Sequence, residues 1–116
     1  MKNWTGAIIE DGLLDVSVMD HVGILNKWVK ELGISDMWTV IEVTVDSDEI
    51  KTVEAKLLKG LRPGWYAYFK RGDRVLIIFK GKSFNIKKGS QLSLSRVKNW
   101  AFKKYNLLPE VFTLNF

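Results

Sequence analysis

Short runs of alternating apolar and polar residues predict a protein rich in β-strands. The alternation is clearest over residues 38–45, where every second side chain would face the same side of an extended strand. Further strands are predicted at residues 5–9, 65–70, 74–80 and 84–86. Gly72 and Asp73 separate two of these strands and are typical of a two-residue hairpin loop, because glycine supplies the positive φ angle that such a turn needs.

Two longer segments carry apolar residues at helical spacing. Residues 50–61 place them at i, i+3, i+7 and i+11, and residues 91–105 show a similar stripe. Asp46 and Glu49 precede the first of these helices at the three-residue spacing of a capping box. A short helical turn is expected at residues 13–20.

Residues 22–32 fit two interpretations. As a helix, this segment would carry the stripe Val22, Leu25, Val29 and Leu32. As a strand, its side chains would alternate between two faces, and periodicity alone does not decide between the two.

The order strand, helix, strand, strand, helix predicts an α+β fold. The expected architecture is an antiparallel-rich sheet with a βαββ (ferredoxin-like) core, two main helices on one face of the sheet, and extra N-terminal strands. No linker or internal repeat interrupts the chain, so residues 1–116 are expected to form a single domain.

Composition excludes several classes of activity. The 116-residue chain has no cysteine, which rules out disulfides, thiol nucleophiles and cysteine-held zinc or iron–sulfur sites. Its longest apolar run, residues 75–79, falls far short of the ~20 residues that span a bilayer. No secretion signal is recognisable at the start, so we expect a cytoplasmic protein without membrane contact.

Charge is divided unevenly along the chain, although the formal net charge is only +5. Residues 1–55 hold four Lys or Arg against 11 Asp or Glu, a net charge of −7. Residues 56–116 hold 14 against two, a net charge of +12. Such a division favours oppositely charged partners. One such partner is a second copy, so assembly into a homo-oligomer is one hypothesis.

An aromatic and basic strand provides the candidate binding surface, which consists of Tyr66, Tyr68, Lys70, Arg71, Lys80 and Lys82. The first two of these residues would share a strand face and form a stacking platform for nucleic-acid bases. The cations suit nucleic-acid phosphates or an acidic protein. Lys82, however, stands where the sheet motif of RNA-recognition domains requires its first stacking ring.

Acidic residues near the one histidine suggest a small carboxylate- or metal-dependent enzyme as an alternative. Glu10, Asp11 and Asp15 precede His21, and paired carboxylates can hold Mg²⁺ or divide acid and base roles. A turn explains these acids more simply, as helix capping explains the acids of residues 46–49. No nucleophile elbow, metal-ligand set or cofactor loop is present, so no catalytic, metal or cofactor residue is assigned.

A series of short pieces extends over nearly the whole chain. They are Trp4-Thr5-Gly6-Ala7-Ile8-Ile9-Glu10 with Leu14 and Asp15, Asp36-Met37-Trp38, Pro63-Gly64-Trp65-Tyr66, Phe69 with Gly72-Asp73, residues 75–80 with Lys82 and Phe84, and Leu108-Pro109-Glu110. In this order the chain resembles a family of small uncharacterised prokaryotic proteins of about this length. The resemblance implies that residues 22–32 form a strand paired with residues 38–45, and it implies no activity. Where the family pattern often has histidines, this chain has Thr39 and Tyr68.

These features favour a non-enzymatic binding or interaction module. Its basic aromatic surface would contact an acidic protein or a nucleic acid. Single-stranded nucleic-acid binding and a small carboxylate- or metal-dependent enzyme are the alternatives.

Overall fold

Six strands and two α-helices make up the computed structural model, which describes residues 3–31, 37–87 and 91–105. They are β1 (Asn3–Ile9), β2 (Gly23–Glu31), β3 (Met37–Asp46), α1 (Ile50–Gly60), β4 (Tyr66–Arg71), β5 (Arg74–Phe79), β6 (Lys82–Lys87) and α2 (Gln91–Tyr105). Two short 3-10 helices, Glu10–Gly12 and Val16–His21, replace the predicted helical turn. Within the described ranges, no helix is both long enough and apolar enough to cross a membrane. The matching piece Leu108-Pro109-Glu110 lies outside those ranges.

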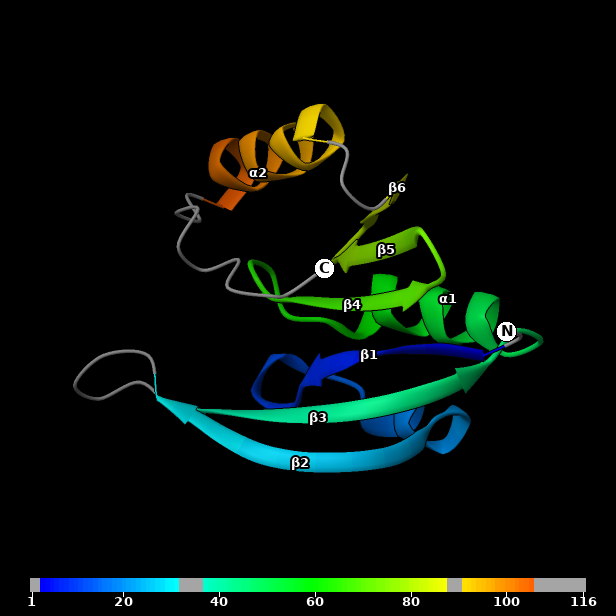
Figure 1. Cartoon of the computed structure of the whole chain (residues 1–116). Coiled ribbons are helices and arrows are strands. Elements are labelled where there is room, and N and C mark those ends of the chain that lie inside the picture. Colours follow the sequence, from blue (N-terminus) through cyan, green and yellow to red (C-terminus); the bar gives the residue numbers. More distant parts are fainter. Residues whose placement is uncertain (1–2, 32–36, 88–90, 106–116) are drawn as a thin grey trace.

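All six strands form one antiparallel sheet in the order β2-β3-β1-β4-β5-β6 (Figure 1). The predicted α+β fold, with an antiparallel sheet and two main helices, is therefore confirmed. The ferredoxin-like core is not confirmed. In such a βαββ unit the third strand inserts between the first two. Here the N-terminal strand β1 lies between β3 and β4, and β5 lies outside β4.

The two helices cover opposite faces of the sheet, so the prediction of both helices on one face was wrong. Alternate residues of β5 show the physical reason. Leu76 and Ile78 belong to the core beneath α1, whereas Ile77 and Phe79 belong to the core beneath α2. A strand that is apolar on both faces needs cover on both. In Figure 1, α2 lies next to the β6 edge and apart from α1.

The ambiguous segment at residues 22–32 contains a strand, as the resemblance implies. This strand, β2, pairs antiparallel with β3, and a β-bulge interrupts the pairing between Ile24 and Asn26. It is also an edge strand of the sheet, at the end opposite β6. Four large apolar side chains of β2 are exposed: Ile24, Leu25, Trp28 and Val29.

α1 packs through its predicted apolar stripe but lacks its predicted cap. Val53 and Leu57 are fully buried against the sheet. The capping box does not form, because Asp46 is the last residue of β3 and no side chain caps the helix start at Glu49. The Glu49 carboxylate instead forms a hydrogen bond with Nδ1 of His21 at 3.1 Å.

Candidate binding surface

The strands from the early and late parts of the chain lie in different halves of the sheet. β2, β3 and β1 form one side of the sheet, whereas β4, β5, β6 and α2, here called the basic half, form the other (Figure 1). Residues 66–104 contain 11 Lys or Arg and one carboxylate, that of Asp73. The basic residues of this part of the sequence are therefore concentrated in one half of the folded molecule.

Tyr66, the first residue of the predicted surface, is buried. Its side chain faces the α2 side of the sheet, is 2% exposed, and has its ring centroid 6.0 Å from that of Phe79. Burial, and to a lesser extent the neighbouring Tyr68, raises the pKa of the Tyr66 hydroxyl well above its usual range. The ring is therefore part of the core and is unavailable for stacking on a base.

Tyr68, Lys70 and Lys82 share the α2-facing side of the sheet and reach its surface. The two residues of β4 are half-buried, and Lys82 is exposed at the start of β6. The ammonium nitrogen of Lys82 lies 5.4 Å from the ring centroid of Phe84. Burial, and secondarily the Glu42 carboxylate, raises the pKa of Tyr68. Of the six residues of the predicted surface, these three lie on the same face of the sheet.

Arg71 and Lys80 lie on the opposite side, and each contacts another part of the fold. Arg71 follows Lys70 in an extended strand and so points to the other face, where its guanidinium lies 4.9 Å from the centroid of the Trp4 ring. Nζ of Lys80 donates a hydrogen bond of 3.1 Å to the carbonyl oxygen of Lys59 in α1. The six predicted residues are therefore divided between the core and two faces.

A groove runs between β6 and α2 on the α2-facing side of the basic half. Its volume is about 280 Å³, and it is lined by Phe84, Asn85, Ile86, Ser93 and Arg96. Phe84 and Ile86 are half-buried, and Arg96 is exposed. Sequence reasoning missed this groove, because no local pattern shows which helix packs beside which strand.

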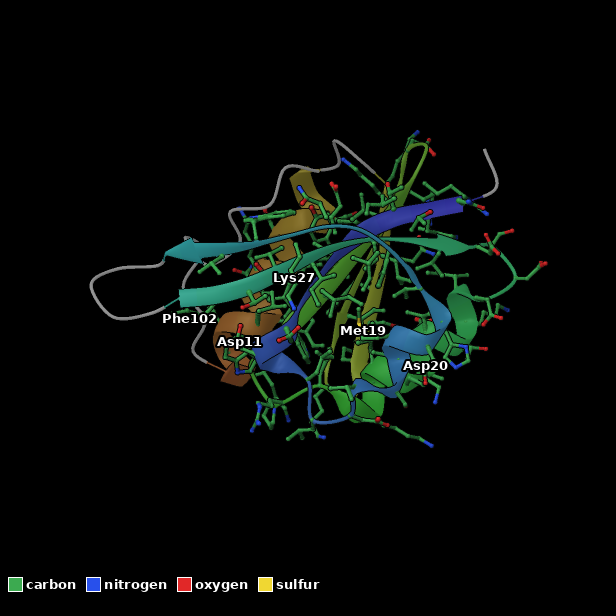
Figure 2. All side chains as sticks on the ribbon, turned by 90° about the horizontal axis from the view of Figure 1, so that it is seen from below. Asp11, Met19, Asp20, Lys27 and Phe102 are labelled. Atoms are coloured by element: carbon green, nitrogen blue, oxygen red, sulfur yellow. The ribbon has the colours of Figure 1, made fainter. Side chains whose placement is uncertain are left out.

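Two of the acids in the enzyme hypothesis serve the fold locally. Glu10 forms an ion pair of 3.0 Å with Lys27, and Asp11 accepts a hydrogen bond of 2.7 Å from the backbone N–H of Thr39. Figure 2 shows Asp20 well away from Asp11, on a different part of the molecule. The fold thus does not gather the early acids into one site.

Asp15 and His21 are also held in local interactions. The Asp15 carboxylate accepts a hydrogen bond of 2.9 Å from the backbone N–H of Ser17, which lowers the pKa of that carboxyl. His21 contacts Glu49 and lies in a shallow pocket of about 340 Å³ lined by Asp20, His21, Val22, Gly23, Thr44, Asp46 and Glu49. Among the residues that the structure describes, no three acidic or histidine side chains are placed to hold a metal ion.

The described side chains thus offer a basic surface with an adjoining groove. No protein-family model, no curated protein and no solved structure matches the chain.

Proposed function

We propose that this protein is a non-enzymatic binding module whose basic half engages an acidic protein segment. One observation carries the proposal: β4, β5, β6 and α2, with the turns between the strands, gather the ten described Lys and Arg residues of residues 66–104 and the carboxylate of Asp73 into one half of the molecule. The described cations of this half are all exposed or half-buried. A surface of one sign attracts partners of the opposite sign and speeds their encounter. A cytoplasmic location is part of the proposal, since the chain has no cysteine.

Single-stranded nucleic acid is the second candidate ligand, favoured by Tyr68 and Lys70 on one face of β4. Recognition of unpaired bases depends on rings that are open to stacking. Tyr66 is buried and Tyr68 is half-buried, so the predicted pair of stacking rings is reduced to one. An acidic protein segment requires the cations but not the rings, and it therefore fits the basic half better.

The enzyme hypothesis has less support. Glu10, Asp11 and Asp15 each form a hydrogen bond or ion pair with another part of the fold. A general acid or base needs a carboxyl whose pKa lies near the working pH. The pKa of Asp15 is shifted the other way, because the Ser17 N–H stabilises the charged form.

Fluorescence anisotropy with two labelled polyanions tests this proposal. We expect poly-glutamate to bind more tightly than an oligothymidylate of equal charge, and salt to weaken both. Lys82→Glu should weaken poly-glutamate binding about fivefold, a change of roughly 1 kcal/mol. Lys51→Glu, the same charge change at an exposed position of α1, should weaken it less than about twofold.

Two outcomes would contradict the proposal. Equal losses in the two variants would mean that net charge alone attracts the polyanion. Tighter binding of oligothymidylate would favour the nucleic-acid candidate instead.

A further inference from the structure

We propose that the groove between β6 and α2 binds an extended acidic peptide segment, which joins the sheet as an additional strand beside β6. This inference rests on the proposed function, for which it names the site and the form of the ligand. Addition of a strand to a sheet edge is a common mode of peptide recognition, in which backbone hydrogen bonds provide affinity and neighbouring pockets provide specificity.

The backbone of β6 lies at an edge of the described sheet. β6 is the last described strand of the sheet, and among the described strands its six residues pair only with β5. In an antiparallel strand, the N–H and C=O groups of alternate residues point to opposite edges. Within the described part of the chain, no backbone hydrogen bond joins the outer edge of β6 to another segment. That edge can accept a further strand.

The groove lies along this same strand. Phe84 and Ile86 point toward α2, whereas Asn85 between them points to the other face. A groove that touches all three residues must lie against the backbone of β6. The Phe84 ring also meets the ring of Trp100 edge-on at a centroid distance of 5.4 Å. This contact fixes the spacing between strand and helix, so the groove is formed before a ligand arrives.

Charge selects the ligand. On the α2-facing side, Arg96 lines the groove and Lys82 begins the strand. On the other side, Arg74 pairs with Lys87 in the strand register and donates a hydrogen bond of 3.1 Å to the side chain of Asn85. A strand added at this edge would therefore meet cations on both of its faces, which favours acidic residues on both.

The carboxylate of Glu54 lies near this edge and has a partner. Glu54 of α1 accepts a hydrogen bond of 2.6 Å from the hydroxyl of Ser83. The apolar surface of Phe84 and Ile86 adds a requirement for one or two apolar residues that face α2. The chemistry therefore fits an extended segment in which acidic residues alternate with occasional valine-like residues.

The test uses the labelled peptide Glu-Val-Glu-Glu-Glu-Val-Glu and two N-methylated forms of it. One form is methylated at its odd-numbered residues and the other at its even-numbered residues, so each lacks the backbone donors of one edge. An added strand uses only one edge. We expect one N-methylated form to bind at least about tenfold more weakly than the parent and the other less than about threefold.

Matched protein variants complete the test. Arg96→Glu should weaken the parent peptide at least about tenfold, and Lys103→Glu, an exposed charge reversal on the same helix outside the groove, less than about threefold. Binding should also slow amide hydrogen exchange in β6. If both N-methylated forms bind equally well and both variants lose affinity equally, the proposal of strand addition is wrong. The basic half would then still bind an acidic peptide, but not as an added strand. If neither this peptide nor poly-glutamate binds, the proposed function fails as well.

Discussion

The guanidinium of Arg71 lies over the indole ring of Trp4, 4.9 Å from its centroid, across the two neighbouring strands β4 and β1. Trp4 is buried, and its Nε1 has no hydrogen-bond partner among the described residues. Arg71 therefore covers the core at this point. It is better explained as a stabilising residue than as part of a ligand surface.

Arg71→Ala should lower the free energy of unfolding by about 1 kcal/mol, because it removes a cation–π contact and uncovers the indole. Arg71→Lys retains a cation on a flexible side chain and should lower the free energy of unfolding by a smaller amount. Urea unfolding followed by tryptophan fluorescence measures both. An unchanged midpoint in Arg71→Ala would show that the contact contributes nothing to stability.

Gly6→Ala should destabilise the fold by about 3 kcal/mol, because β1 and β4 approach closely at this residue. An added Cβ would clash with the carbonyl oxygen of Tyr68 and lie 2.7 Å from Cα of Phe69. Both are backbone atoms, so relief requires the strands to separate. Gly72→Ala is the control: its φ of +59° makes alanine strained, but the space around it is open. We expect a loss of only about 1 kcal/mol there, and equal losses in urea unfolding would contradict the close approach.

Alkaline pH should destabilise the protein through Tyr66. Burial raises the pKa of its hydroxyl in the folded state above the unfolded value of about 10. The unfolded state therefore releases its proton first, so the stabilising effect is complete below pH of about 10 and is lost as the pH rises further. Unfolding measured at several pH values should show a smaller alkaline loss in Tyr66→Phe than in the natural chain. Parallel losses would assign the effect to other groups.

The edge strand β2 should favour association at high protein concentration. Ile24, Leu25, Trp28 and Val29 are exposed on a strand whose outer edge borders no other described strand. Val29→Lys should reduce association seen by sedimentation velocity and change the free energy of unfolding by less than about 0.5 kcal/mol. If Val29→Lys associates as strongly as the natural chain, the contact between copies lies elsewhere. The remaining hypothesis is then that acidic residues of one copy contact basic residues of another. Association that falls at high salt would support that hypothesis.

Local patterns predicted much of the fold. The strand at residues 38–45, the hairpin at Gly72-Asp73 and the buried stripe of α1 all follow from the spacing of side chains within one element. The insertion of β1 between β3 and β4 does not, because it depends on pairing between residues far apart in the chain.

The division of the predicted surface residues between the core and two faces was missed for a related reason. Residues 75–79 are all apolar and all buried, which is the signature of a strand covered on both faces. Interpreted as a strand covered on both faces, residues 75–79 would have predicted helices on both faces of the sheet and a buried Tyr66. The groove at Arg96 has no comparable local signal, because it exists only where α2 packs beside β6.

The central claim is that the basic half binds an acidic protein segment. NMR titration of the isotope-labelled chain with poly-glutamate tests it most directly, because every backbone amide reports its own position. We expect saturable shifts concentrated in β4, β6 and α2, near Lys70, Lys82 and Arg96. Shifts confined to β2 and β3, or unchanged spectra at low salt, would contradict it.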